Sequence, residues 1–224
     1  MTQVFLASRN VKKLEEMRRI LTASLSADRR DVAGAAGTAI EVLGLDDVAA
    51  YDEPVEDEPT FAGNALLKAR AALAATGLPS VADDSGLCVD ALNGMPGVLS
   101  ARWSGGPRDD RRALDRGNNE LLLQQLSDVP DGRRGAHFAS AVAFCAPAEP
   151  AGQPLELVVE DRMTGRVTRE TRGSGGFGYD VLFCADEFPD RTTAELDPAQ
   201  KDAISHRGRA LRRIAPQIVA ALTR

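Results

Sequence analysis

The sequence predicts an α/β fold, in which a mixed β-sheet is flanked by helices. Before residue 90, short apolar runs alternate with segments of helical periodicity in the order β-α-β-α-β, which is typical of parallel strands. Later apolar runs follow one another without an intervening helix, which indicates an antiparallel section and a second lobe. The 224 residues contain no internal repeat and no linker long enough to divide domains, so we expect one domain, residues 1–224.

The elements of the N-terminal part follow from hydrophobic spacing and from end signals. Apolar residues recur at helical spacing from Val11 to Leu21, behind Asn10, a residue type that caps helices. Residues 24–38 have no clear period and are interpreted as a surface insertion. Strands are predicted at residues 4–7, 39–43 and 81–82, and helices at residues 11–21 and 60–76.

The C-terminal part combines strands with short helices. Asp197 followed by proline is typical of a helix start, and Ser205 is a suitable cap for the final helix. The other predicted elements are a helix at residues 119–126, strands at residues 137–145 and 181–183, and a hairpin of residues 155–159 and 166–168 that turns at residues 163–165.

Composition limits the class of protein. The formal charge of −6 and the pI of about 5.1 argue against a general nucleic-acid-binding surface, which is usually basic. Cys88, Cys145 and Cys184 lie far apart without metal-ligand spacing, as expected of reduced thiols. The N-terminal apolar run is too short for a signal peptide, and no run approaches the roughly 18 residues of a membrane span. We therefore expect a cytoplasmic protein with no nucleic-acid or membrane partner.

Two adjacent carboxylates, Asp83 and Asp84, directly follow the apolar residues 81–82. Polar groups at the carboxyl edge of a buried strand are typical of a site. Between Arg70 and Arg102 there is no Lys or Arg, and two like charges this close raise each other's cost of ionisation. A divalent metal would relieve this cost, and oxygen ligands point to Mg²⁺. An Asp-Ser-Gly turn that caps the next segment is an equally open interpretation.

Two segments before these aspartates could contribute to a site. Most of the acidic run at residues 41–58 is expected to be a solvated face, but Glu53 or Glu56 is a candidate second metal ligand. The first helix begins with Lys12 and Lys13, which suits a phosphate, although an ordinary βα unit gives the same pattern.

Two segments in the C-terminal part are also unusual. Glycines in residues 173–180 let the backbone approach a ligand closely, or simply form a turn before the next strand. Arg207 lies in the first turn of the last helix, where a cation opposes the helix dipole unless an anion or a ligand carbonyl meets it. His206 beside it is more often surface decoration than a ligand contact.

In this order and spacing, the segments resemble the inosine/xanthosine triphosphate pyrophosphatase family, enzymes that remove non-canonical purine nucleotides. The resemblance covers nearly the whole chain, and the motifs are specific together although each alone is weak. They are Ser-Arg-Asn-Val-Lys-Lys at residues 8–13, Asn-Ala-Leu-Leu-Lys-Ala at 64–69, Ala-Asp-Asp-Ser-Gly-Leu at 82–87, Gly-Met-Pro-Gly at 94–97, Ser-Ala-Arg at 100–102, Gly-Gly-Phe-Gly-Tyr-Asp at 175–180, and Lys201 with Ile-Ser-His-Arg at 204–207.

The resemblance implies a long twisted mixed β-sheet flanked by helices, with two lobes, a central cleft and usually a homodimer. It implies Mg²⁺-dependent hydrolysis of ITP, dITP or XTP to the monophosphate and pyrophosphate. It makes Asp84 the general base and a metal ligand. It also makes Glu56 the second metal ligand, because the distance of Glu56 from Phe61 along the chain matches that of the family's metal-binding glutamate. The implied substrate-binding residues are Ser8, Arg9, Asn10, Val11, Lys12, Lys13, Ser85, Phe177, Gly178, Tyr179, Asp180, Lys201, His206 and Arg207.

Base selection has a physical basis in the implied residues. Phe177 would stack on the purine, and Arg207, which has only donors, could satisfy a 6-keto oxygen but not a 6-amino group. The chain departs from the family pattern at Gly63, where Glu is usual, and at Val181, where Pro is usual.

Other functions fit parts of the pattern. One alternative is a pyrophosphatase for canonical or modified pyrimidine nucleotides, and another is a nucleotide-binding regulatory module without catalysis. A phosphatase with a covalent nucleophile is disfavoured, because Cys88 is not followed by a phosphate-binding loop with Arg. Turnover of ITP, XTP, dTTP and UTP at equal concentration separates these hypotheses.

Overall fold

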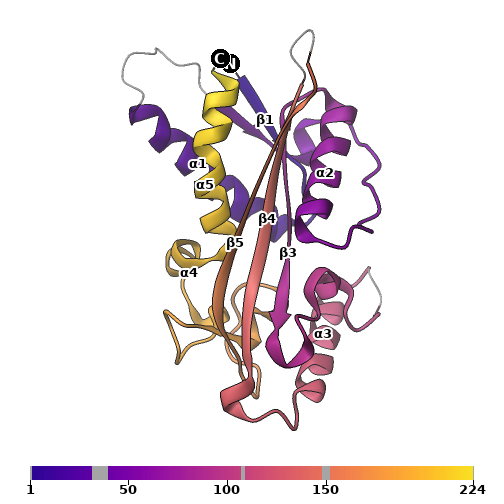
Figure 1. Ribbon diagram of the computed structural model, residues 1–224, viewed down its shortest axis with the longest axis vertical. Helices are drawn as coiled ribbons and strands as arrows, with labels where there is room; N and C mark the ends of the chain where they lie inside the picture. The colour runs from indigo at the N-terminus through magenta and orange to yellow at the C-terminus, as the bar shows by residue number, and fades with distance from the viewer. Residues whose placement is uncertain (1, 32–39, 107–108, 148–151, 224) are drawn as a thin grey trace. The chain divides into compact units, whose positions relative to one another are not determined.

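The computed structural model describes residues 2–31, 40–106, 109–147 and 152–223, and for residues 26–31 it describes the backbone alone. The strands in this part of the chain are β1 (Thr2–Leu6), β2 (Ile40–Leu43), β3 (Ser80–Val89), β4 (Gly135–Ala146), β5 (Leu155–Val167) and β6 (Phe183–Ala185) (Figure 1). The α-helices are α1 (Val11–Asp31), α2 (Phe61–Thr76), α3 (Arg111–Gln125), α4 (Pro198–Ile204) and α5 (His206–Leu222).

The strands form a mixed sheet in the order β2-β1-β3-β4-β5-β6. β1 pairs in parallel with β2 and with β3, whereas β5 and β6 pair antiparallel, with Gly165 opposite Ala185. This confirms the predicted mixed sheet with flanking helices. The chain divides into two compact units, which we call unit 1 (Met1–Asp84, Ser140–Asp161 and Arg207–Arg224) and unit 2 (Ser85–Ala139 and Arg162–His206).

Unit 1 has a helix layer on each face of its part of the sheet (Figure 1). Along β1, Val4 and Leu6 pack in a cluster with α1 and α5, whereas Phe5 packs with the alanines of α2. On β3, Val81 belongs to the first cluster and Ala82 to the second. Because successive side chains of a strand point to opposite faces, α1 and α5 cover one face and α2 covers the other.

The helix α2 forms as its end signals predict. The side chain of Thr60 accepts a hydrogen bond from the Gly63 N–H, so it caps the helix. The helix ends at Gly77, whose φ of 70° lies in the left-handed region that glycine adopts without steric cost. This helix leads directly into β3.

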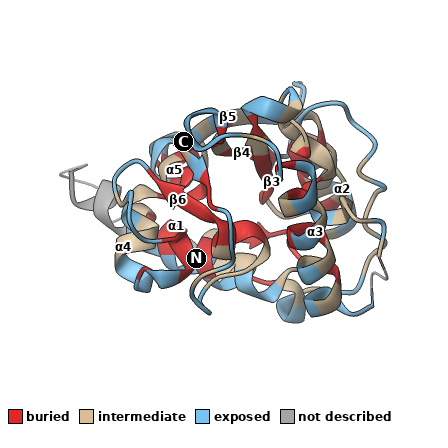
Figure 2. Cartoon of the chain, turned by 90° about the horizontal axis from the view of Figure 1, so that it is seen from below, coloured by how far each residue is buried: buried red, intermediate tan, exposed pale blue. Residues whose placement is uncertain are grey.

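The core of unit 2 is built from β3 to β6, α3 and the 3₁₀ helix η5 (Gly178–Leu182). Leu87 of β3 and Met163 of β5 are fully buried in it, together with Leu122 and Leu126 at the end of α3. Figure 2 shows the same trend across the chain, since the buried residues concentrate on the strands.

Three predicted element boundaries are wrong. β3 continues to Val89, so Asp83 and Asp84 lie in the middle of a strand rather than at its end. Helix α1 continues to Asp31, so residues 24–31 are not an irregular insertion, and residues 32–38 lie outside the described part. Helix α3 begins at residue 111 instead of 119, behind its cap.

The predicted hairpin at residues 163–165 is also wrong, because β5 is one continuous strand. Gly165 had suggested a turn, but in the structure it lies where β6 approaches closely. A Cβ at this position would collide with the backbone carbonyl of Cys184 and with Phe183. The glycine therefore permits close strand packing within an extended backbone.

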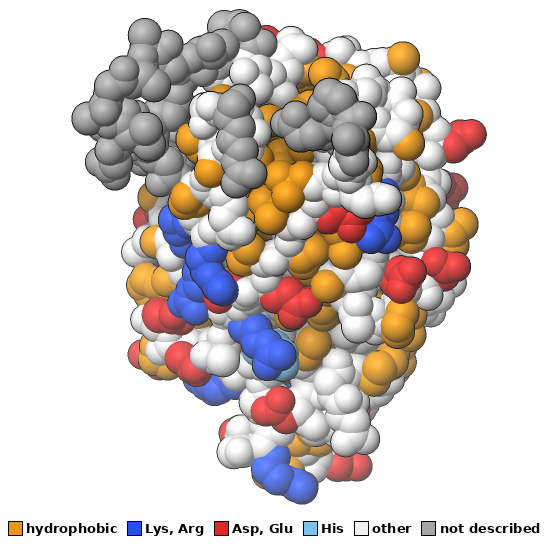
Figure 3. All heavy atoms as spheres, turned by 45° about the horizontal axis from the view of Figure 1, so that its top comes forward, with side chains coloured by type: hydrophobic (Ala, Val, Ile, Leu, Met, Phe, Trp, Pro, Cys, Tyr) orange, Lys and Arg blue, Asp and Glu red, His pale blue; other side chains and the backbone are white. Residues whose placement is uncertain are grey.

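The surface carries charges of both signs. On the face shown in Figure 3, basic and acidic side chains lie close to one another among the described residues, in keeping with 27 Lys and Arg against 33 Asp and Glu in the whole chain. None of the described helices combines the length and the hydrophobicity that a membrane crossing demands.

Candidate active site

Asp83 and Asp84 lie on β3 just beyond the end of its pairing with β1. That pairing ends with Leu6 opposite Val81, and the Ala7 N–H then donates to the Val81 carbonyl. The two carboxylates therefore sit beside the carboxyl end of β1, although not at the end of their own strand. As consecutive strand residues, they point to opposite faces of the sheet.

Asp83 lies on the face covered by α1 and α5. Its Oδ2 accepts from the Lys13 Nζ at 3.2 Å and from the Arg207 Nε at 2.9 Å, and its carboxylate is almost fully buried. Burial by itself would raise the pKa of Asp83, but the charges of Lys13, Arg207 and Lys68 outweigh it and hold that pKa well below its usual range. Asp83 is therefore an ionised anchor for two cations.

Arg207 is the centre of this buried ion-pair cluster. While its Nε donates to Asp83, its Nη1 donates to the Glu16 Oε2 at 2.7 Å, and only 2% of the residue is exposed. The anions that meet this first-turn cation are thus the protein's own carboxylates, on β3 and α1. The contacts give Arg207 a structural role, and its predicted contact with the base stays a prediction.

Asp84 faces α2 on the other side of the sheet. Its Oδ2 accepts from the Asn64 Nδ2 at 3.0 Å, and its Oδ1 lies 3.7 Å from the Lys68 Nζ. The Oδ1 of Asn64 accepts from the Glu58 N–H, which fixes the amide with its NH₂ group toward Asp84. Burial raises the pKa of Asp84, although the charges of Lys68 and Lys13 oppose the shift. A carboxylate with a raised pKa is a stronger proton acceptor than an ordinary aspartate.

Lys68 joins Asp84 to Glu56, because its Nζ also donates to the Glu56 Oε1 at 2.9 Å. Glu53 instead pairs with Arg9, whose Nε lies 3.5 Å from its Oε2. Of the two candidate acids, Glu56 is therefore the one that shares a contact residue with Asp84. Neither Lys68 nor Asn64 was among the predicted site residues, although both stand in one of the motifs.

The premise of the metal argument from sequence is wrong. Although no Lys or Arg is near Asp83 and Asp84 in sequence, the fold brings Lys13, Lys68 and Arg207 to them. Among the described residues, no group of three or more His, Cys, Asp or Glu is placed to hold a metal. Two carboxylates still fit Mg²⁺, which typically takes one or two protein carboxylates and completes its coordination with substrate phosphates and water.

The start of α1 is arranged as predicted for a helix cap. The Oδ1 of Asn10 accepts from the Lys13 N–H at 3.2 Å. Ser8 is buried before it, whereas Val11 is 66% exposed in the first turn. Lys12 and Arg9 are also exposed, and the Arg9 Nη2 donates to the Tyr51 carbonyl.

In unit 2, Asp180 organises the glycine-rich loop. Its Oδ2 accepts from the Phe177 N–H at 2.8 Å and from the Lys201 Nζ at 2.6 Å, while its Oδ1 accepts from the Thr193 hydroxyl. A Cβ at Gly176, where φ is 68°, would collide with this carboxylate. Asp180 therefore holds the loop and the lysine together.

Phe177 of this loop and Lys201 of α4 form a pair of side chains that is suited to a base. The Lys201 Nζ lies 5.1 Å from the centroid of the Phe177 ring, within the range of a cation–π contact. Both residues are half-buried, whereas Asp180 is buried beneath them. An aromatic face with an adjacent cation suits a planar base that bears phosphates.

Two residues of α3 hold Gly178, and the sequence prediction missed both. The Asp115 Oδ2 accepts from the Gly178 N–H, and the Asn119 Nδ2 donates to the Gly178 carbonyl, each at 3.0 Å. Asp115 and Asn119 are four residues apart and therefore share one face of the helix. This spacing is the only signal in the sequence that could have pointed to a joint role. The next residue, Tyr179, is buried and donates its hydroxyl to the Ser100 carbonyl.

The remaining predicted residues of unit 2 are less directly placed. His206 is buried, and its ring stacks on Phe138 with a centroid separation of 5.0 Å and an interplanar angle of 8°. This packing differs from the surface decoration expected of a histidine at a helix start. Ser85 follows Asp84 on β3 and is half-buried.

Comparisons with known proteins cover nearly the whole chain. Residues 4–217 match the sequence model of the Ham1 family. A dITP/XTP pyrophosphatase of Nocardia farcinica is 56% identical over 98% of this chain and 96% of its own length. A dITP/XTP pyrophosphatase of Mycobacterium tuberculosis is 52% identical over 97% of this chain and 95% of its own length.

Solved structures give the same result. The nucleoside-triphosphatase / dITP/XTP pyrophosphatase of Mycobacterium abscessus has a TM-score of 0.69 at 48% identity and covers 95% of this chain and 98% of its own. The Staphylococcus aureus Ham1 protein has a TM-score of 0.76 at 29% identity, with coverages of 98% and 100%. This chain belongs to the Ham1 family.

Proposed function

We propose that this protein hydrolyses non-canonical purine nucleoside triphosphates, ITP, dITP and XTP, to the monophosphate and pyrophosphate. The observation that carries the proposal is the identity of more than half of all residues, over nearly full length, to relatives named dITP/XTP pyrophosphatase. The polar clusters of units 1 and 2 supply groups that suit such a reaction.

Asp84 is proposed as the general base. A carboxylate buried against α2, with a raised pKa, can take the proton of a water molecule that attacks the α-phosphorus. Asn64 keeps the carboxylate in one orientation, and Lys68 balances its charge. Asp84 and Glu56 are the residues that would hold Mg²⁺, which would neutralise charge on the phosphate oxygens when bound.

Lys13 and the start of α1 are proposed to receive phosphate groups. The positive end of the helix dipole favours an anion there. Asn10 caps the first turn of the helix. Residues 8–12 are proposed to line the path by which the phosphates reach this turn. Because Asp83 fixes the Lys13 ammonium, that charge is held in place before substrate arrives.

Phe177 and Lys201 are proposed to bind the base, with Gly178, Tyr179 and Asp180 shaping the loop. Stacking on Phe177 does not distinguish one purine from another. Recognition of the 6-keto oxygen by Arg207 is retained as a hypothesis, although Asp83 and Glu16 take two of its nitrogen donors. His206 and Ser85 are retained as substrate-binding residues on the resemblance alone.

We also propose that residues 1–224 act as a single pyrophosphatase domain, that the protein is a cytoplasmic homodimer, and that it has no nucleic-acid partner. The resemblance supports the dimer, and the net charge of −6 supports the last point.

A substrate panel tests the function. The protein is incubated with Mg²⁺ and equal concentrations of ITP, dITP, XTP, GTP, ATP, dTTP or UTP, with released pyrophosphate and the nucleotide product both quantified. We expect ITP, dITP and XTP to be preferred by kcat/KM, with IMP and pyrophosphate formed from ITP. Formation of IDP and phosphate would place the attack at the wrong phosphorus, and preference for dTTP or UTP would favour a pyrimidine enzyme. Tight ITP binding without turnover would instead indicate a regulatory module.

A further inference from the structure

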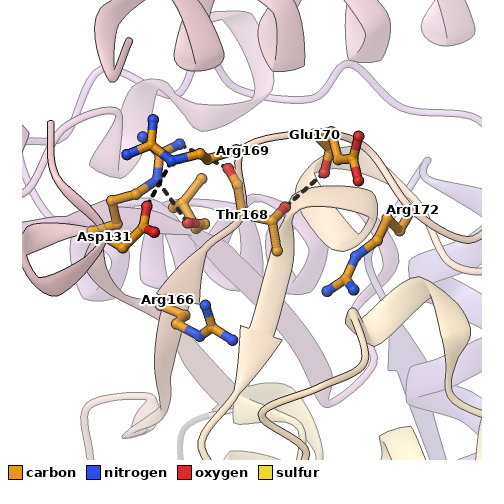
Figure 4. A pocket seen from close by; sticks show the side chains of 8 residues that line it. Asp131, Arg166, Thr168, Arg169, Glu170 and Arg172 are labelled. Carbon is orange, nitrogen blue, oxygen red and sulfur yellow. Dashed lines mark hydrogen bonds and ion pairs between the residues drawn. The ribbon is translucent and has the colours of Figure 1, made fainter. Parts of the chain in front are cut away.

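The described part of unit 2 contains a pocket of about 230 Å³ that the proposed reaction does not use. Four arginines line it, Arg134, Arg166, Arg169 and Arg172, against two acids, Asp131 and Glu170 (Figure 4). None of its lining residues belongs to the predicted substrate-binding set. An excess of arginine in a concave site is unusual in a chain whose formal charge is −6.

Two of the arginines form the wall of the pocket. Arg134 is buried, and its guanidinium donates to the carbonyls of Leu126 and Thr168 at 2.7 Å. Arg169 pairs with Asp131 at 2.6 Å, so this acid is already matched by one cation. Burial and, to a lesser extent, the nearby charge of Arg169 lower the pKa of Arg134, and the charge of Asp131 opposes this shift.

The other two arginines are fixed by neutral groups. The Arg166 Nη2 donates to the Pro189 carbonyl at 2.8 Å, and the Arg172 Nη1 donates to the neighbouring Asp190 carbonyl at 3.4 Å. Arg172 also contacts the Cys184 Sγ at 3.3 Å. These contacts orient the guanidinium groups without neutralising them, and neither arginine has an ion pair with any described residue.

The side chains of Arg166 and Arg172 point toward the same space, which Thr168 borders, whereas Glu170 points away from it (Figure 4). Arg172 interacts electrostatically with Glu195, but that carboxylate accepts hydrogen bonds from Thr192 and does not line the pocket. Arg166 and Arg172 are therefore held in position, and neither forms an ion pair with Asp131 or Glu170, the two acids that line the pocket.

We propose that this pocket binds a phosphate-bearing anion between Arg166 and Arg172. The planar fork of an arginine matches two phosphate oxygens at once, and two oriented forks select a small anion with several oxygens. Inorganic phosphate, pyrophosphate and the phosphate of a nucleotide share this chemistry. The site is distinct in its residues from the proposed active site, so it does not depend on the proposed function.

Calorimetric titration of the full-length protein with inorganic pyrophosphate tests the proposal. We expect Arg166→Gln and Arg172→Gln each to weaken one class of pyrophosphate sites by about tenfold or more, because each removes charge-assisted hydrogen bonds. Arg213→Gln is the control outside the pocket, since Arg213 is an exposed arginine that also donates to a backbone carbonyl, that of Glu160, although it additionally pairs with Asp161. ITP turnover without added pyrophosphate should be unchanged in all three variants. Glu170→Gln should tighten binding.

Labelling of the wild-type protein decides the question if a variant fails to fold. Phenylglyoxal modifies accessible arginines, and peptide mass spectrometry reports each site. Pyrophosphate should protect Arg166 and Arg172 but not Arg213. Parallel titrations with inorganic phosphate and with IMP distinguish an inorganic anion from a nucleotide. Equal affinities in both pocket variants and wild type, or labelling of Arg166 and Arg172 that pyrophosphate does not reduce, would overturn the proposal.

Discussion

Replacement of Asp115 by alanine should weaken substrate binding without slowing the chemical step. The Asp115 carboxylate accepts a hydrogen bond from the Gly178 N–H. Gly178 directly follows Phe177, whose ring is proposed to stack on the base. In Asp115→Ala, the hydrogen bond that Asn119 donates to the Gly178 carbonyl would be the remaining side-chain contact between α3 and Gly178 described above. The Phe177 ring would then lose part of its fixed orientation. This prediction rests on the proposed function.

The expected magnitude follows from the type of bond. A hydrogen bond to a carboxylate contributes about 1.5–3 kcal/mol, and about 1.4 kcal/mol corresponds to a tenfold change in an equilibrium constant. KM for ITP should therefore rise by about ten- to hundredfold, while kcat changes little, because the lost order affects ground state and transition state alike. Asp115→Asn keeps an acceptor oxygen and should restore most of the affinity.

Steady-state kinetics on four variants separate this role from helix stability. Asp115 also forms an i,i+4 ion pair with Arg111, at 3.1 Å, which is worth only about 0.3–0.5 kcal/mol. Arg111→Ala removes that pair and leaves the bond to Gly178, so its KM should equal that of wild type. Glu120→Ala, at an exposed site on the same helix, is the surface control. A kcat loss in Asp115→Ala at unchanged KM would refute the reasoning, as would an equal KM increase in Arg111→Ala.

Three further predictions concern the described clusters. Asp84→Asn should abolish ITP hydrolysis while circular dichroism and the thermal midpoint stay close to wild type; an active variant would remove the assignment of the general base. Chelation of divalent metal with EDTA should stop turnover, and Mg²⁺ should restore it, whereas full activity in EDTA would contradict the metal proposal. Asp83→Ala should lower the free energy of unfolding by about 3–5 kcal/mol in urea titrations, because it removes a carboxylate that pairs with the buried Arg207 and leaves the pair with Glu16; a loss below about 1 kcal/mol would show that the cluster is solvated.

Local patterns predicted much of the fold, because they depend on near neighbours. The cap at Thr60 and the left-handed Gly77 delimit α2 through contacts within one helical turn. Helical periodicity also identified α1 and α5. The prediction failed where a residue type has two uses. Gly165 is typical of a turn, but here it admits a neighbouring strand, and only the pairing of β5 with β6 distinguishes the two.

The candidate site was predicted in its residues more than in its electrostatics. Asp83 and Asp84 stood out as adjacent acids, but the cations that neutralise them come from α1, α2 and α5, up to 124 positions away in sequence. Spacing along the chain contains no information on such pairs. The contacts of Asp115 with Gly178 were missed for the same reason, since they join segments 63 residues apart.

The two aspartates of β3 form their hydrogen bonds with helices on opposite faces of the sheet. Lys13 of α1 and Arg207 of α5 donate hydrogen bonds to Asp83, whereas Asn64 of α2 donates to Asp84. The charges of Lys13 and Lys68, however, act on the pKa of both aspartates. Attempts to shift the pH optimum or the metal preference should therefore begin with α2, where Asn64 and Lys68 are the contacts to vary. A shift of β3 by a single residue would exchange the two acids between layers, and both functions would be lost together.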